Sequence, residues 1–270
     1  MEFEYRQTQI DDESLKKYAD LLTKVFPSTS KYTFEFLKWQ YVDNPCGTVV
    51  GYDAFYENKL VAHYVTIPVK YSKNNNPYNG LLSLNTATDP QFQGNGLFTK
   101  LAKKTYELAT TKGYQFIIGV ANQNSTHGFI KNLGFKLISS LNAYIYLFDS
   151  EQAAPPNNIF QSIIDNDTLK WRISNPSNKY KFKANCIYSD TDYNFIKACL
   201  SKVKKHPTVS NFSIGFKMVI GVGNAPNTLL KIRVPDKLKP SPLNLIFRKL
   251  GEFEINFTEI YFELIDFDAY

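Results

Sequence analysis

Hydrophobic residues recur along the chain with two spacings, and both are typical of an α/β protein. In some segments apolar side chains lie three and four residues apart, which predicts helices with one buried face. In others, β-branched and aromatic residues form short runs between turn residues, which predicts strands. In the first seventy residues these patterns predict helices at 11–26 and 33–41 and strands at 49–56 and 60–69. Asp11 or Asp12 is suited to cap the first helix, and Thr33 the second.

The most informative stretch follows these elements and runs from Asn85 to Phe98. The apolar run 81–84 before it predicts a buried strand, and the apolar spacing after it predicts an amphipathic helix. Gly94 and Gly96 lie between the two, where the absence of a Cβ lets the backbone approach a ligand closely. Free N–H groups of such a loop and of the helix start form a site for a phosphate or pyrophosphate.

Two common phosphate loops do not fit this stretch. A dinucleotide fingerprint needs a third glycine where Thr99 stands, and a P-loop needs Lys and Ser/Thr after Gly96. The pattern Gln91-x-x-Gly94-x-Gly96 instead resembles the acyl-CoA loop of the GNAT N-acetyltransferase family, Gln/Arg-x-x-Gly-x-Gly/Ala. A predicted strand at 113–120 and a helix ending at Leu133-Gly134-Phe135 extend the resemblance over about residues 81–148.

The resemblance implies an α/β fold in which a GNAT-like mixed central sheet is flanked by helices. A break in composition at 148–158 indicates a linker. The predicted organisation is an acyl-CoA-binding GNAT-like acetyltransferase domain at 1–150, a linker at 151–158, and a smaller C-terminal α/β domain at 159–270.

Short internal similarities favour a tandem of two related, GNAT-like domains over an unrelated β-rich second domain. Leu37-Lys38-Trp39 followed by Asn44-Pro45 recurs as Leu169-Lys170-Trp171 followed by Asn175-Pro176. The segment 130–134 also resembles 247–251. The second half has no Gln-x-x-Gly-x-Gly, and no helix pattern follows its Gly221-x-Gly223. We therefore expect it to shape or cover the acceptor pocket and not to bind CoA.

The resemblance implies that acetyl-CoA is the donor substrate and that three groups of residues bind it. The backbone of the central strand would hold the pantetheine arm and face the thioester, the loop would hold the pyrophosphate, and residues after the next strand would complete the site. The predicted cofactor-binding residues are Thr86, Ala87, Thr88, Gln91, Gln93, Gly94, Asn95, Gly96, Leu97, Phe98, Asn122, Asn124 and Phe129. Asn122 is equally suited to cap the following helix.

The catalytic groups are less clear from the sequence. The family usually places a tyrosine, as acid for the leaving thiolate, where this chain has Ile130. His127 and Tyr144 are the candidate replacements, although a core or surface role is common for any tyrosine. His63 is the candidate base or acceptor ligand, and a structural role in its apolar strand is the alternative. A water chain is a further alternative for the base.

The composition limits the ligands and the cellular location that we expect for this protein. The net charge of +6 suits a phosphate-bearing ligand, but the basic residues do not cluster as nucleic-acid binding requires. No run is long enough to span a membrane, and the three cysteines have no metal-binding spacing, so we expect no metal. A cytoplasmic protein is expected. The oligomeric state does not follow from the sequence.

The expected function is an N-acetyltransferase that moves the acetyl group of acetyl-CoA directly to a primary amine. The aromatic residues of the second half suggest an amino sugar or a nucleotide-linked amino sugar as acceptor; they are Tyr180, Phe182, Tyr188, Tyr193 and Phe195. The alternatives are a non-catalytic acyl-CoA-binding or interaction module and an aminoacyl transferase of a related tandem fold.

Overall fold

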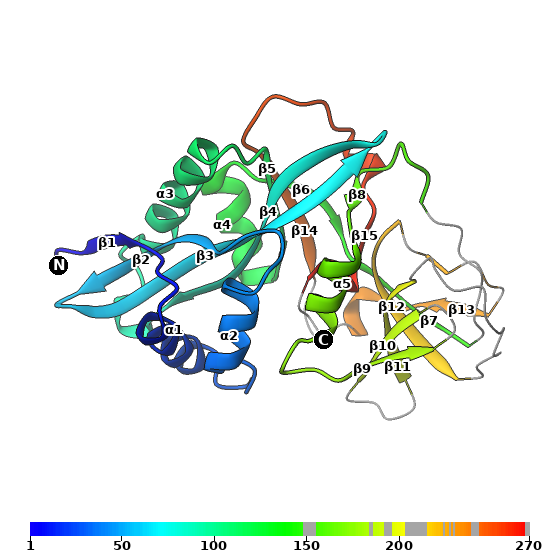
Figure 1. Cartoon of the computed structure of the whole chain (residues 1–270), viewed down its shortest axis with the longest axis horizontal. Coiled ribbons are helices and arrows are strands. Elements are labelled where there is room, and N and C mark those ends of the chain that lie inside the picture. Colours follow the sequence, from blue (N-terminus) through cyan, green and yellow to red (C-terminus); the bar gives the residue numbers. More distant parts are fainter. Residues whose placement is uncertain are drawn as a thin grey trace.

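The structure is a computed structural model. It describes residues 1–147, 155–183, 186–191, 196–202, 215–223, 225–226, 228, 230–238 and 243–267. The described strands form two sheets (Figure 1). The predicted boundary at residue 150, the first part of the predicted linker, and Tyr193 and Phe195 lie outside the described residues.

The first sheet has the order β1-β2-β3-β4-β5-β14-β6, and β8 also pairs with β3. Its neighbouring strands are antiparallel, except for β4 and β5, which are parallel. The strands are β1 (Glu4–Gln7), β2 (Val50–Tyr56), β3 (Lys59–Lys73), β4 (Asn76–Thr88), β5 (Phe116–Ala121), β6 (Lys136–Ser140), β8 (Gln161–Ser162) and β14 (Asn244–Lys249).

The second sheet has the order β13-β7-β12-β11-β10-β9, and β15 also pairs with β12. Here β11 and β12 are the parallel pair. The strands are β7 (Asn142–Tyr146), β9 (Tyr180–Lys183), β10 (Cys186–Asp190), β11 (Ile196–Lys202), β12 (Phe216–Val222), β13 (Lys231–Arg233) and β15 (Phe262–Glu263).

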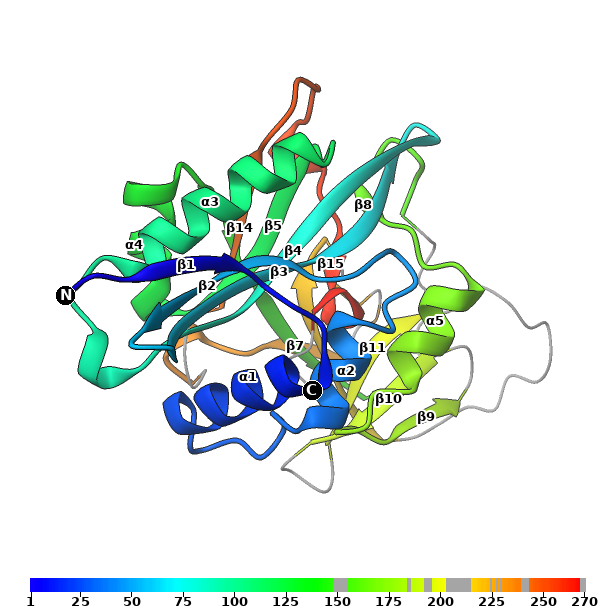
Figure 2. The same ribbon diagram turned by 60° about the vertical axis from the view of Figure 1, so that its left-hand side comes forward.

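The two sheets share one plan and have exchanged one strand. Two series of six strands correspond, β2-β3-β4-β5-β14-β6 in the first sheet and β9-β10-β11-β12-β7-β13 in the second. In both series neighbouring strands are antiparallel except at the third pairing, β4–β5 or β11–β12. β7 falls within the predicted first domain, 1–150, but lies in the second sheet. β14 lies in the first sheet, where it pairs with β6 and with β5, beside which Figure 2 shows it. This correspondence agrees with a tandem of related α/β domains, and the tandem itself stays a prediction.

The helices cover both faces of the first sheet (Figure 1). On one face α3 and α4 pack over Leu81 and Ile117, while Leu82 and Ile118 belong to a separate core on the side of α1 and α2. Neighbouring residues thus face opposite sides, as the two-residue period of a strand requires. The helices are α1 (Asp12–Val25), α2 (Phe34–Tyr41), α3 (Leu97–Thr111), α4 (Gln123–Leu133) and α5 (Asn166–Ile173), with short 3₁₀ turns η1 (Pro90–Phe92), η2 (Asp236–Leu238), η3 (Phe257–Glu259) and η4 (Leu264–Asp266).

The predicted elements of the first half are confirmed with small shifts in their ends. Asp11 and Thr33 cap α1 and α2 by accepting backbone N–H groups of their first turns. Strands β3 and β4 are longer than predicted, because they continue as one hairpin to a turn in which Asn74 and Asn75 have positive φ.

The helices α2 and α5 carry the repeated sequence and meet at a pair of tryptophans (Figures 1 and 2). The rings of Trp39 and Trp171 stack with centroids 4.9 Å apart. Trp39 Nε1 donates to the Trp171 carbonyl at 2.6 Å, and Trp171 Nε1 donates to the Trp39 carbonyl at 2.8 Å. The repeat therefore forms a nearly symmetric contact between the halves of the chain.

The second predicted repeat is wrong. Residues 130–134 form the end of α4 and its Gly134 cap, whereas 247–249 lie in β14. The sequence similarity of the two segments does not reflect a similar structure, because one has a helical backbone and the other an extended backbone.

Two findings bear on the expected location. Within the described residues, no helix combines the length and the hydropathy needed to cross a bilayer. Cys46 is free, whereas Cys199 is disulfide-bonded. Because disulfides are uncommon in a reducing cytoplasm, the cytoplasmic location stays a prediction.

Candidate functional site

A gap opens between the parallel strands β4 and β5. Their pairing extends from Gly80 opposite Phe116 to Ser83 opposite Gly119. Beyond these residues β4 continues to Thr88 and β5 to Ala121 without pairing to one another. Backbone groups on the facing edges are therefore available to a ligand.

A β-bulge shapes the β4 side of this gap. On β3 and β4, His63 lies opposite Ala87 and Val65 lies opposite Leu84. Asn85 and Thr86 together therefore face Tyr64, the two-against-one arrangement of a bulge. Asn85 takes the left-handed conformation, with φ of 47°.

The bulge sets the direction of the following amides. The Asp89 N–H donates to the Val61 carbonyl of β3 at 2.8 Å. Since successive backbone groups of a strand point to opposite sides, the Thr88 N–H points away from β3, toward the gap. The predicted segment Thr86–Thr88 thus lines the gap along its β4 edge.

The glycine loop connects this edge to α3. Gly94 and Gly96 have φ of +81° and +70°, and a Cβ built at either would meet no atom within 4 Å. Gly96 is the N-cap of α3 and provides no side-chain cap, and the first turn of the helix has no acidic residue. The space beside both glycines is therefore open and the start of this 15-residue helix has no side-chain cap, as anion binding requires. The side chains of Gln91 and Gln93 are exposed beside it.

Asp89 anchors the start of the loop. Its carboxylate caps η1 by accepting the Gln91 N–H, and Lys24 Nζ of α1 lies 2.7 Å from it. Burial raises the pKa of Asp89, but the hydrogen bond from Lys24 and that from Gln91 outweigh burial and leave this pKa below its usual value. Asp89 is therefore ionised and paired, so its charge does not oppose an anion at the loop.

The predicted residues of α4 have mixed surroundings. Asn122 is the N-cap of α4 and accepts the Ser125 N–H at 3.0 Å. Asn124 and His127 are exposed. Phe129 is buried and packs edge-on against Phe98, with ring centroids 5.1 Å apart.

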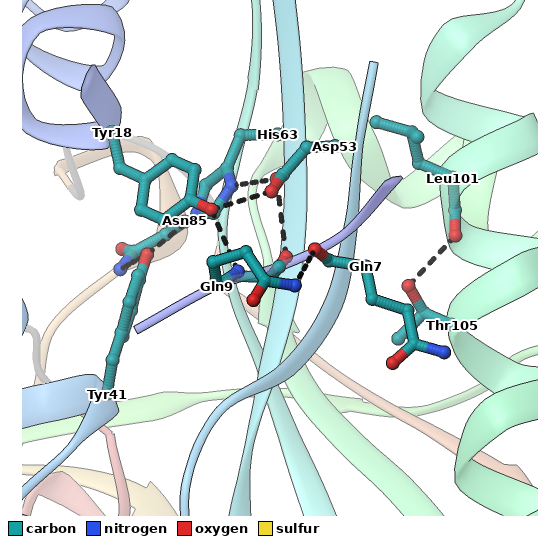
Figure 3. Close-up of polar contacts among 10 residues, drawn as sticks. Gln7, Gln9, Tyr18, Tyr41, Asp53, His63, Asn85, Leu101 and Thr105 are labelled. Atoms are coloured by element: carbon teal, nitrogen blue, oxygen red, sulfur yellow. Dashed lines mark hydrogen bonds and ion pairs between the residues drawn. The ribbon is translucent and has the colours of Figure 1, made fainter. Parts of the chain in front are cut away.

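His63 is the centre of a buried polar network behind the bulge (Figure 3). Its Nδ1 lies 2.6 Å from Asp53 Oδ1, and its Nε2 lies 3.0 Å from the Tyr41 hydroxyl. The Tyr18 ring stacks on the imidazole at 4.3 Å, and the Tyr18 hydroxyl donates to Asp53 Oδ2 at 2.8 Å. Asn85 Nδ2 donates to the Tyr41 hydroxyl at 2.9 Å and to Gln40 Oε1 at 2.6 Å.

These contacts fix the direction of the hydrogen bonds. Burial, followed by the charge of Asp53, raises the pKa of Tyr18, and burial raises the pKa of Tyr41 well above its usual value. Both hydroxyls therefore remain donors. Because the Asp53 carboxylate accepts hydrogen bonds, Nδ1 of His63 carries the proton and Nε2 accepts from Tyr41. Both ring nitrogens of His63 thus have partners within the protein.

The remaining catalytic candidates lie apart from this network. Tyr144 is on β7 of the second sheet, opposite Val219 and Arg233, and it packs against a cluster formed by Tyr146, Tyr188, Cys199 and Val219. None of its described contacts connects it with His63 or the glycine loop. Ile130, at the position of the expected acid, is 38% exposed.

Sequence analysis missed Asp53, Tyr18, Tyr41 and Asn85. The one available signal was an acidic residue within the otherwise apolar strand 49–56, because a buried carboxylate needs partners. Its partner His63 lies directly opposite on β3, a register that the sequence does not specify.

The fold and the site define the class: an α/β protein whose mixed sheet opens between two parallel strands, with an uncapped glycine loop and helix beside the opening. The particular family follows from the sequence. The profile described as an acetyltransferase (GNAT) domain matches residues 4–138, half of the chain, and the protein belongs to this family. No curated protein sequence matches the chain.

Solved structures show the same fold over nearly the whole chain. A probable N-acyltransferase from Enterococcus faecalis V583 superposes with a TM-score of 0.63 at 9% identity, covering 93% of this chain and 73% of that one. A GCN5-related N-acetyltransferase from Anabaena variabilis gives 0.63 at 11% identity with the same coverage. Eis1 from Mycobacterium abscessus gives 0.59 at 9% identity, covering 92% and 74%. At such identities the likeness establishes the fold.

Proposed function

We propose that this protein is an N-acetyltransferase that moves the acetyl group of acetyl-CoA to a primary amine by direct transfer. The observation that carries the proposal is the glycine loop, in which two positive-φ glycines face open space and the following helix start is uncapped, beside the gap between β4 and β5. The pyrophosphate of the donor would bind there. Its pantetheine arm would lie along the free edges of the two strands.

The proposed reaction replaces the C–S bond of the thioester with a C–N bond and moves one proton from nitrogen to sulfur. The amine nitrogen attacks the thioester carbon, the C–S bond breaks, the amine loses a proton, and the CoA sulfur leaves as a thiolate that takes up a proton. The Thr88 N–H would stabilise the charge that develops on the thioester oxygen, a contribution on the order of a hundred- to a thousandfold in rate. With both nitrogens of His63 engaged, exposed His127 or water is the better proton carrier.

We further propose that the acceptor amine binds in a hollow of about 380 Å³ along α1, a size that is typical of small-ligand sites. Tyr32 and Phe34 supply aromatic surface, Asp20 supplies a carboxylate for an ammonium group, and Lys16 lines the same hollow. Thr23 lines the hollow and precedes the Lys24 that contacts Asp89 at the loop. An amino sugar, free or nucleotide-linked, has the size and the charge that such a hollow would take.

The second half has a different part in this proposal. The connection between β4 and β5 spans residues 89–115 and holds the loop and α3, whereas that between β11 and β12 spans residues 203–215. Since the second connection is about half as long and lacks the glycine pattern, we propose that one CoA binds per chain. Tyr188 is buried and therefore not suited to stack on an acceptor.

Gly94→Trp tests the loop, with Gly113→Trp as the matched control. Both glycines have positive φ and open surroundings, but Gly113 follows the far end of α3. We expect Gly94→Trp to weaken acetyl-CoA binding in calorimetry at least about a hundredfold. The reason is that two charge-assisted hydrogen bonds, at about 1.5–3 kcal/mol each, would be lost. Equal affinities of the two variants would refute the assignment.

A non-catalytic acyl-CoA-binding module is the second candidate, and Ile130 favours it because this side chain cannot donate a proton. The two functions differ in one measurement. An enzyme releases CoA thiol from acetyl-CoA with some member of a panel of amino sugars and their nucleotide conjugates. A binding module takes up acetyl-CoA and releases no thiol with any of them.

A further inference from the structure

The network behind the bulge is more extensive than a buried histidine needs. It joins four elements and the segment after β1. The residues are Tyr18 of α1, Tyr41 of α2, Asp53 of β2, His63 of β3, and Thr8 just after β1. Figure 3 shows that the contacts reach Asn85. This residue forms the bulge itself.

Asn85 is an unusual member of the network. It is one of five non-glycine residues with positive φ among the described residues, and the other four lie in the turns at 57–58 and 74–75. Asparagine tolerates this conformation better than most residues, yet inside a strand it needs support from its surroundings. Its side-chain N–H groups supply that support by donating to Gln40 and Tyr41, which are both fully buried in the last turn of α2.

We propose that Tyr41 and Asn85, with the His63–Asp53 pair behind them, are positioning residues that hold the β4 bulge so that the Thr88 amide faces the thioester oxygen. The proposal rests on the proposed function, since it gives these residues a task at the same site. The hydroxyl of Tyr41 is the link: it donates to His63 Nε2 and accepts from Asn85 Nδ2. His63, held by Asp53 and stacked on Tyr18, orients that hydroxyl and exchanges no proton with substrate.

Three variants separate the parts of the network. Tyr41→Phe keeps the ring and removes the link to Asn85. Asn85→Ala removes the side-chain anchor and penalises the left-handed backbone, whereas Asn85→Gly removes the anchor and favours that backbone. Tyr71→Phe is the matched control, since it removes the hydroxyl of a tyrosine that is also buried on the first sheet, eight residues along β3 from His63.

Amide NMR shifts read the position of Thr88 without turnover. In the wild type, acetyl-CoA should move the Thr88 amide proton downfield relative to CoA, which has no thioester oxygen, while either ligand moves the amides of Gly94 and Gly96. Tyr41→Phe and Asn85→Ala should lose half or more of the Thr88 effect and keep the loop response. Asn85→Gly should lie between Asn85→Ala and the wild type, and Tyr71→Phe should match the wild type.

The outcomes distinguish the two proposals. If the loop amides of the wild type do not respond to CoA, the proposed function fails. If they respond but the network variants leave the Thr88 difference unchanged, the positioning role is overturned and the proposed function stands.

Kinetics supply a second readout. Tyr41→Phe should lower kcat about ten- to a hundredfold with little change in the KM for acetyl-CoA, the cost of a misplaced reacting group. The pH dependence of kcat should keep its shape. A variant that loses the limb of this profile near neutral pH would show that His63 acts as a base through Tyr41, and would refute the proposal.

Discussion

The contact between Trp39 and Trp171 gives a prediction in which two nearly symmetric substitutions should differ. The Trp171 carbonyl accepts Trp39 Nε1, and it also accepts the Ser174 hydroxyl at 2.9 Å. Among the described residues, the hydrogen bond to the Trp39 carbonyl comes from Trp171 Nε1. Trp171→Phe therefore leaves a buried carbonyl without its donor, whereas Trp39→Phe leaves a carbonyl that Ser174 still satisfies.

The magnitude follows from these contacts. Replacing an indole by a phenyl ring at a buried site loses about 1 kcal/mol of apolar burial in either variant. An unsatisfied buried carbonyl adds about 1–3 kcal/mol in Trp171→Phe. We expect the free energy of unfolding to fall by about 1–2 kcal/mol in Trp39→Phe and by about 2–4 kcal/mol in Trp171→Phe. Total stabilities of domains are about 5–15 kcal/mol, so both losses are measurable.

Urea denaturation followed by far-ultraviolet circular dichroism measures both losses. Tryptophan fluorescence gives an independent reading at the interface itself, because the sequence has two tryptophans and both belong to this contact. The double variant should cost less than the sum of the single variants, since the two residues share one contact. Equal losses, or a larger loss for Trp39→Phe, would refute the reasoning from hydrogen-bond partners.

Three further predictions concern acidic residues. Burial raises the pKa of Asp266 to about 6 from 3.8, so the stability that protonated Asp266 provides is complete below about pH 4 and lost as the pH rises through 6. The free energy of unfolding of the wild type, measured relative to Asp266→Asn, should thus fall by about 2 kcal/mol between pH 4 and 7, and a constant difference would contradict this. The lowered pKa of Asp89 has the opposite effect. The stability that ionised Asp89 provides is present above pH 3.8, the usual pKa of the group, and is lost as the pH falls below that value. When denaturation midpoints are measured over a pH series, Asp89→Asn should therefore show a smaller decrease at acidic pH than the wild type. Asp20→Asn should raise the KM for the amine several-fold and leave the KM for acetyl-CoA unchanged; unchanged values for both would remove Asp20 from the acceptor site.

Features that depend on nearby residues could be predicted from the sequence. Asp11 and Thr33 mark helix starts through contacts three residues away, and Gly134 ends α4 with a positive φ of 65°. The glycine loop was recognisable for the same reason, because its backbone conformation and the amphipathic helix after it are both local.

Features that depend on partners far along the chain could not be predicted. The apolar run of β14 reads as a strand, but nothing in it specifies that it pairs with β5 and β6. Asp53 and His63 meet because of the β2–β3 register, and Asn85 reaches Tyr41 because α2 packs behind the bulge. The similarity between 130–134 and 247–251 led to a wrong prediction of a repeat, because similar residues at five positions do not determine the backbone conformation.

The exchanged strands also govern how the protein is made. Because β14 fills the place between β5 and β6, the sheet that carries the glycine loop lacks a middle strand until synthesis has passed residue 249. A nascent chain that ends earlier would expose the unpaired edges of β5 and β6, which invite association with other chains. The sheet that carries the glycine loop is thus completed only late in synthesis, and a gene product shortened before β14 would lack this inner strand.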